Sequence, residues 1–151
     1  ILAGKVGSNL ASELGSMRVT EQIDALEIMG VNTESYLIAT RIIAAVITIP
    51  LLVAIAAYSG IMGGFIATSL SSYYSTEDYI RGIRMLFDPF DVQLMFIKSF
   101  TFSFIVSSIS CYMGYYVKGG SVEIGKASTQ AVVYSCIFVL LADYVIASLL
   151  L

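Results

Sequence analysis

The chain has 151 residues, of which 58% are hydrophobic and 13% are charged, with a formal net charge of −3 and no histidine. Soluble domains carry about 25% charged residues. This deficit and the long charge-free runs predict an all-α integral membrane protein, a polytopic helical bundle. The weak negative charge argues against a nucleic-acid partner, and the lack of histidine removes most zinc and general-base sites. Cys111 and Cys136 stand alone in apolar runs, which favours buried small side chains over a disulfide or metal site.

Residues 1–12 have the composition of the end of a membrane helix that begins further upstream, so we expect the chain to lack part of its N-terminal region. Small residues recur there at helical spacing and allow another helix to approach closely. These residues are Gly4, Gly7, Ser8 and Ala11.

Residues 13–35 form a charged stretch between apolar segments. Within them, Glu21–Met29 is predicted to form a short amphipathic helix, with Thr20 as its N-cap and Gly30 as a left-handed residue after its end. Over the whole stretch from Glu13 to Gly30, the polar side, at steps of three, comprises Arg18, Glu21, Asp24 and Glu27. The apolar side of the same stretch comprises Leu14, Met17, Ile23, Leu26 and Met29. Such a helix between membrane segments is either a membrane-surface helix or a docking element for a soluble partner.

Three complete membrane spans are predicted after the polar helix, because a span needs about 20 apolar residues. They cover residues 42–66, 92–117 and 127–151. Residues 69–91 form an extramembrane segment with a short helix that begins at Thr76, and residues 118–126 form a polar loop. Gly60 and Gly64 stand four apart in the first span, which predicts close helix packing.

Two charged residues lie inside the predicted spans. Lys98 is roughly 9 Å inside its span at 1.5 Å per residue, where it either reaches the head groups or pairs with an acid. Asp143 serves either structural hydrogen bonding or substrate passage and gating. The pair leaves open an ion- or proton-coupled secondary transporter or channel that uses Asp143 and Lys98 as a relay. A structural anchor of an envelope complex is a third alternative.

Residues 120–127 approach the pattern of a phosphate-binding loop but do not complete it. Ala127 stands where a hydroxyl would bind the metal, and no strand precedes the glycines. We therefore predict that the chain is not an enzyme and has no ATPase activity of its own. If ATP drives this protein, a separate subunit binds the ATP and Mg.

The distribution of Lys and Arg predicts the orientation in the membrane. Lys5, Arg18, Arg41, Lys118 and Lys126 fall on one side, against Arg81, Arg84 and Lys98 on the other. The positive-inside rule then places residues 13–35 and 118–126 in the cytoplasm and residues 69–91 on the opposite, periplasmic side.

The run from Glu13 to Leu26, followed by Met29-Gly30-Val31, resembles the signature of MlaE-type permeases. These are the membrane subunits of ABC transporters that carry phospholipids or other lipids across the envelope with MCE proteins. The likeness continues through Ile97-Lys98-Ser99 and Ala142-Asp143-Tyr144 and covers essentially the whole chain. It departs at Asn32-Thr33, where members often have Asp-Pro.

The resemblance implies a multi-pass homodimer in the bacterial inner (cytoplasmic) membrane, with cytoplasmic ABC ATPase subunits and a periplasmic MCE-domain protein as partners. It would move phospholipids between inner and outer membranes and so maintain outer membrane lipid asymmetry. No cofactor would be bound by this chain, since ATP and Mg belong to the ATPase. The residues implied to couple to the ATPase are Glu13, Arg18, Thr20, Glu21, Gln22, Asp24 and Glu27. As a hypothesis, the lipid cavity between two copies is lined by Tyr58, Met62, Phe65, Lys98, Ser103 and Ser107.

Overall fold

The computed structural model describes residues 1–70 and 75–150, and every regular element in those ranges is helical. The elements are α1 (Leu2–Val19), α2 (Gln22–Ile28), the π-helix η1 (Glu34–Ala39), α3 (Thr40–Leu70), α4 (Thr76–Leu86), α5 (Pro89–Tyr115) and α6 (Ser121–Leu150). Three continuous helical segments are long and apolar enough to cross a membrane: Glu34–Leu70, Pro89–Tyr115 and Ser121–Leu150. The prediction of an all-α, multi-pass membrane protein is therefore confirmed.

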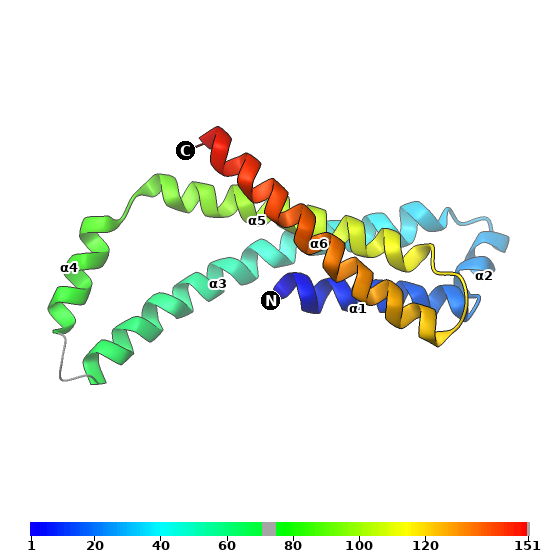
Figure 1. Cartoon of the computed structure of the whole chain (residues 1–151), viewed down its shortest axis with the longest axis horizontal. Coiled ribbons are helices and arrows are strands. Elements are labelled where there is room, and N and C mark those ends of the chain that lie inside the picture. The colour runs from blue at the N-terminus through cyan, green and yellow to red at the C-terminus, as the bar shows by residue number, and fades with distance from the viewer. Residues whose placement is uncertain (71–74, 151) are drawn as a thin grey trace.

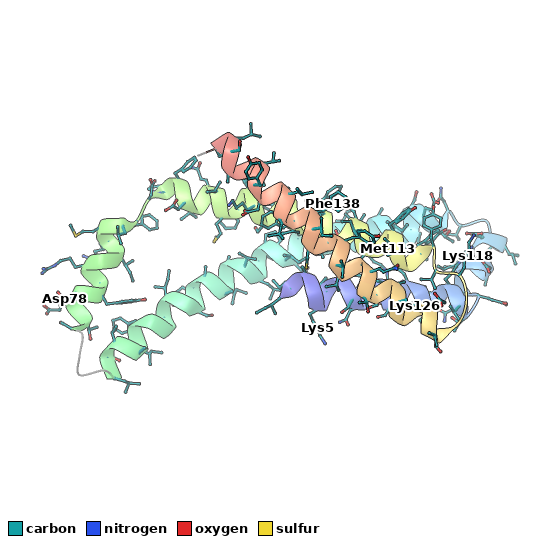
Figure 2. The ribbon with its side chains drawn as sticks, in the orientation of Figure 1. Lys5, Asp78, Met113, Lys118, Lys126 and Phe138 are labelled. Carbon is teal, nitrogen blue, oxygen red and sulfur yellow. The ribbon has the colours of Figure 1, made fainter. Side chains whose placement is uncertain are left out.

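The α1, α5 and α6 helices pack together (Figure 1). The whole of α4 and the second half of α3 extend away from them. The α2 helix lies at one end of the molecule and α4 at the other. Figure 2 shows Lys118 and Lys126 at the α2 end and Asp78 at the α4 end.

Several predicted boundaries need correction. The loop predicted over 118–126 is shorter, because α6 begins at Ser121, where the Gly120 carbonyl accepts from the amides of Glu123 and Ile124. The helix that contains the span predicted over 92–117 begins at Pro89, where the Asp88 carboxylate caps it by accepting from the Phe90 amide at 2.9 Å. No break separates residues 1–12 from the charged region, since α1 continues to Val19.

Close contact between α1 and α5 depends on small residues. A Cβ on Gly114 would lie 2.5 Å from the carbonyl oxygen of Ala11, and a Cβ on Gly7 would lie 2.9 Å from Ser110 Oγ. The predicted packing pair behaves differently. Gly64 lies against the Tyr79 side chain of α4, whereas a Cβ on Gly60 would meet no atom within 4 Å.

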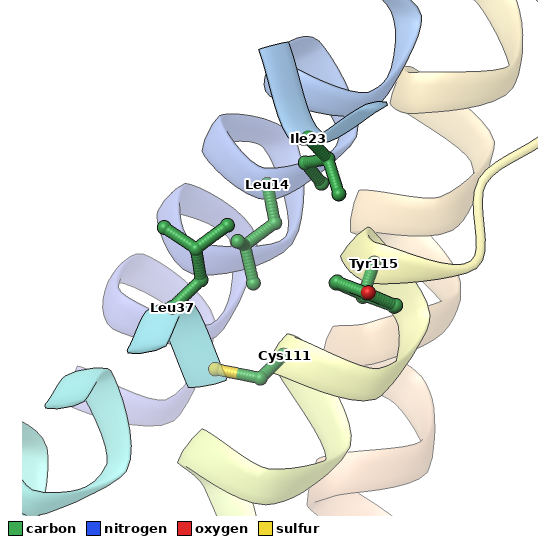
Figure 3. Packing of buried hydrophobic residues seen from close by; sticks show 5 residues of the cluster. All are labelled: Leu14, Ile23, Leu37, Cys111 and Tyr115. Carbon is green, nitrogen blue, oxygen red and sulfur yellow. The ribbon is translucent and has the colours of Figure 1, made fainter. Parts of the chain in front are cut away.

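The main hydrophobic cluster lies beside α2 and comprises Leu14, Ile23, Leu37, Cys111 and Tyr115, whose side chains converge from α1, α2, η1 and α5 (Figure 3). Cys111 is fully buried, as predicted, but Cys136 is exposed on α6. That prediction was wrong because an apolar run indicates burial in lipid or in protein, and the described helices leave this face of α6 uncovered. Beyond Pro50, most of the large apolar side chains of α3 are exposed in the same way.

Candidate functional site

The charged region bends sharply between α1 and α2. Thr20 does not cap α2, and its hydroxyl instead donates to the Ser16 carbonyl at 2.8 Å at the end of α1. A threonine hydroxyl can bond the carbonyl four residues back, and here that bond competes with capping. Glu21 occupies the N-cap position in the left-handed region (φ 60°) without a side-chain cap bond. The prediction for Gly30 is confirmed, since its φ is 79° and it follows Met29, the C-cap of α2.

The bend brings Arg18 at the end of α1 against the acids of α2. Its Nη1 lies 2.8 Å from Asp24 Oδ1 and 3.9 Å from Glu27 Oε1. The guanidinium carbon lies 5.8 Å from the centre of the Tyr115 ring, within the range of a cation–π contact. The even spacing of these residues therefore does not reflect one continuous helical face. It reflects a turn at which Arg18 of α1 forms ion pairs with Asp24 and Glu27 of α2.

A buried pair of hydroxyls extends this network. Thr33 Oγ1 and the Tyr115 hydroxyl oxygen are 2.8 Å apart, and they lie 3.2 and 3.3 Å from Glu27 Oε1, respectively. Thr33 and Tyr115 are 3% and 5% exposed. We did not predict this cluster from the sequence, because Thr33 and Tyr115 are 82 residues apart and only the fold brings them together.

Two further contacts fasten the same end of the molecule. Arg41 at the start of α3 holds both carboxylate oxygens of Glu13 on α1, at 2.8 and 3.0 Å, the strong two-point geometry of arginine with a carboxylate. The Tyr116 hydroxyl donates to Glu34 at 3.3 Å. The Glu34 carboxylate raises the pKa of Tyr116 above its ordinary value.

The residues predicted to couple to an ATPase therefore divide into two groups. Glu13, Arg18, Asp24 and Glu27 are engaged in ion pairs within the chain. Thr20, Glu21 and Gln22 are exposed at the bend. They lie on the same short segment as the exposed apolar side chains of Ile28 and Met29, which are 87% and 68% exposed.

Inside the spans, Lys98 Nζ on α5 lies 2.7 Å from Asp143 Oδ1 on α6. The sequence left two possibilities for Lys98, contact with the head groups or pairing with an acid, and the structure shows the pairing. Lys98 also lines an open cavity of about 580 Å³ between α1, α3, α5 and α6, together with Ser99 and Ser103. The walls are otherwise apolar, so the lysine is the only cationic group among the described lining residues.

The other residues of the predicted lipid cavity do not line this one. Ser107 is fully buried and donates to the Ser103 carbonyl at 2.7 Å. Tyr58, Met62 and Phe65 are exposed on the part of α3 that leaves the bundle. A shared cavity between two copies stays a prediction, and within one chain only Lys98 and Ser103 come together.

Comparison with known proteins places this arrangement in a family. The family profile described as Permease MlaE matches residues 1–149. The chain belongs to the MlaE permease family. Among its relatives are probable ABC transporter permease proteins of Rickettsia bellii and Rickettsia prowazekii, 40% and 42% identical over 149 residues. These matches cover 99% of this chain and 58% of each relative.

A plant protein is also among the relatives. The protein TRIGALACTOSYLDIACYLGLYCEROL 1 of the Arabidopsis thaliana chloroplast is 33% identical over 148 residues, which is 98% of this chain and 42% of that protein. The chain thus spans about half the length of the curated relatives it matches.

Proposed function

We propose that this chain is the non-catalytic membrane core of an ABC transporter permease subunit that moves phospholipids or related lipids between the inner and outer membranes of a bacterium. It acts in the inner membrane as a homodimer, with a cytoplasmic ATPase and a periplasmic MCE-domain protein. Membership of the MlaE family and the permease names of its relatives support this function. The structural observation that carries it is the exposed surface of α2.

The α2 surface has the composition of a docking site. Glu21 and Gln22 are exposed at its start, and Ile28 and Met29 are exposed at its end. Exposed apolar side chains beside charged ones are typical of protein interfaces. The helix is held from behind by Ile23, which is fully buried. A partner can therefore contact the exposed side of α2 while Ile23 keeps the other side packed against the rest of the chain.

Charge at the α2 end supports its cytoplasmic placement. Lys118 and Lys126 lie at this end (Figure 2), as do Arg18 beside α2 and Arg41 at the start of α3. Short cytoplasmic segments carry the excess of Lys and Arg in membrane proteins. On this orientation, α4 lies on the periplasmic side, where an MCE-domain protein would bind.

The uncovered half of α3 supports a second copy and a lipid path. Beyond Pro50 its large apolar side chains, including Tyr58, Met62 and Phe65, are exposed. Side chains of this kind hold acyl chains or pack against a neighbouring subunit. Lys98 supplies a cation that could attract a lipid phosphate, although in this structure it is paired with Asp143.

The function is tested by charge reversal at the bend, in the complex purified from native membranes through a tag on this subunit. Glu21→Lys is expected to reduce the ATPase that co-purifies and the lipid-stimulated ATP hydrolysis. Glu77→Lys, an exposed acid in the first turn of α4 at the opposite end of the molecule, is the matched control and should leave the amount of co-purified ATPase unchanged. Asp24 is a poorer choice because it already pairs with Arg18. Wild-type protein that brings down no ATPase would contradict the proposal.

The second candidate, an ion- or proton-coupled transporter, draws on the intramembrane pair of Lys98 and Asp143. Such a protein would move substrate in proteoliposomes under an ion gradient with no ATPase present. Transport of labelled phosphatidylethanolamine that requires ATP and ignores an imposed pH gradient would exclude it.

A further inference from the structure

We propose that the hydroxyls of Thr33 and Tyr115 fasten α2 to the end of α5 through Glu27, so that force applied to α2 reaches this membrane span directly. The inference rests on the proposed function, in which a partner pushes on α2. It makes Glu27, Thr33 and Tyr115 positioning residues that face their own chain, with Glu27 acting inward rather than as an ATPase contact.

The three groups form a closed hydrogen-bond set. Glu27 Oε1 is within 3.2 Å of Thr33 Oγ1 and 3.3 Å of the Tyr115 hydroxyl, and the two hydroxyls are 2.8 Å apart. Each hydroxyl carries one proton. Either Thr33 donates to Glu27 and Tyr115 donates to Thr33, or Tyr115 donates to Glu27 and Thr33 donates to Tyr115. In both arrangements the carboxylate accepts one hydrogen bond, and the hydrogen of each hydroxyl has an acceptor.

Burial gives this set its strength. Thr33 and Tyr115 are 3% and 5% exposed, so water does not compete effectively for their hydroxyls. The acceptor carboxylate of Glu27 is itself half exposed, so the burial lies on the hydroxyl side of the set. A hydrogen bond to a charged acceptor is nevertheless stronger than one between neutral groups. Removing either hydroxyl leaves the other buried with fewer partners, and the loss is larger than that of an exposed hydrogen bond.

The α2 helix depends on these contacts because it has only seven residues. Helices this short are not stable alone in water, so packing determines where α2 lies. Tyr115 contacts α2 in two ways: its ring belongs to the cluster that buries Ile23 (Figure 3), and its hydroxyl bonds Glu27. Within the described ranges, the side-chain hydrogen bonds and ion pairs of α2 run to Arg18, Thr33 and Tyr115. Thr33 is the N-cap of η1, which continues into α3, so Tyr115 is the residue that ties α2 to a different span.

Through Tyr115, this arrangement adds α5 to the η1–α3 segment as a span tied to α2. Tyr115 is the last residue of α5, and Lys98 lies roughly 26 Å along the same helix at 1.5 Å per residue. Moving one end of a continuous helix displaces its other groups. Movement of α2 would therefore reach the Lys98–Asp143 pair and the cavity beside it through α5.

The test measures labelled phosphatidylethanolamine moved per ATP hydrolysed, in proteoliposomes of the complex purified from native membranes. Thr33→Val and Tyr115→Phe each remove a hydroxyl and keep the side-chain shape. Each is expected to lower this ratio roughly tenfold, the size of losing one hydrogen bond to a charged group. Thr33→Ser retains the hydroxyl and should keep the wild-type ratio. The double variant should resemble the single ones, since members of one network do not act additively.

Tyr116→Phe is the matched control. Tyr116 follows Tyr115 in the chain and bonds Glu34 of η1 instead of α2. It should leave the ratio unchanged, and all variants should retain the ATPase. The inference is wrong if Thr33→Val keeps the wild-type ratio, or if Tyr116→Phe lowers the ratio as much as Tyr115→Phe. A wild-type complex without ATPase would overturn the proposed function and the inference together. A wild-type complex that couples ATP hydrolysis to transport, with variants that behave like it, would overturn the inference alone.

Discussion

Lys98 on α5 and Asp143 on α6 form an ion pair inside the predicted membrane spans, with 2.7 Å between Nζ and Oδ1. Lys98 lies roughly 14 Å from the start of α5 and Asp143 roughly 11 Å from the end of α6, at 1.5 Å per residue. The two helices run in opposite directions (Figure 1) and so bring opposite charges to a similar depth. An unpaired charge at such a depth is costly, and pairing offsets part of that cost.

Asp143→Asn should therefore destabilise the protein. Removing one partner of a buried pair costs about 3–5 kcal/mol. The Lys98 and Asp143 side chains are 26% and 47% exposed, so we expect a loss of about 2 kcal/mol. Thermal unfolding in detergent micelles measures this loss. Exchanging the charges, with Lys98→Asp and Asp143→Lys together, should recover most of it. An exchange as unstable as the single variant would mean that the pair does not hold α5 to α6.

The crossing of α1 and α5 gives a second prediction. In Gly114→Ala the new Cβ would lie 2.5 Å from the carbonyl oxygen and 2.9 Å from the Cα of Ala11. These are backbone atoms, which move only if the helices separate, and overpacking of this kind costs about 1–3 kcal/mol. Gly125→Ala is the control, because its Cβ would meet nothing within 4 Å. It should leave the unfolding midpoint unchanged or raise it slightly, since alanine favours a helix by up to about 1 kcal/mol. Equal stability of the two variants would contradict this crossing.

The helices were predictable from the sequence because membrane spans depend on long apolar runs. Gly30 was predictable for a similar reason, since a left-handed residue after a helix is usually glycine. The boundary at Ser121 was missed because its first turn is polar and resembles a loop in composition. The exposed Cys136 was missed because the sequence alone cannot distinguish burial in protein from burial in lipid.

The candidate site was less predictable, because its contacts depend on how distant segments align. The sequence indicated that Lys98 would either pair or reach the head groups, and only the relative position of α5 and α6 selects Asp143. The bend at Glu21 is a local conflict, since a non-glycine residue in the left-handed region is unfavourable. Packing of Ile23 and the pairing of Arg18 with Asp24 outweigh this cost.

The contact between Tyr116 and Glu34 gives a prediction about titration. The Glu34 carboxylate raises the pKa of Tyr116 from its ordinary value of 10.0, so the neutral phenol and its hydrogen bond to Glu34 persist to higher pH. Glu34→Gln should lower the pKa towards the ordinary value. The difference in ultraviolet absorbance between each protein and its Tyr116→Phe counterpart isolates this group. Glu13→Gln, which removes an acid paired with Arg41, should leave the Tyr116 titration unchanged.

Substitutions at Glu21 can distinguish an effect on the stability of the subunit from an effect on ATPase binding. Its left-handed conformation costs roughly 1–2 kcal/mol in a residue with a side chain, and glycine adopts it freely. Glu21→Gly should therefore raise the free energy of unfolding by about 1 kcal/mol. Under the proposed function the same change removes an exposed charge from the docking surface, so ATPase binding should weaken while the subunit becomes more stable.

Opposite changes in the two measurements are the expected signature, because functional sites often retain strain that a better-folding residue would relieve. Thermal unfolding measures stability, and the ATPase recovered with the tagged subunit measures docking. Glu21→Asn keeps a residue that tolerates the left-handed region and removes the charge, so it should weaken docking with a smaller gain in stability. If Glu21→Gly stabilises the subunit and the ATPase binds as before, the strained glutamate shapes the bend between α1 and α2 and does not contact the partner.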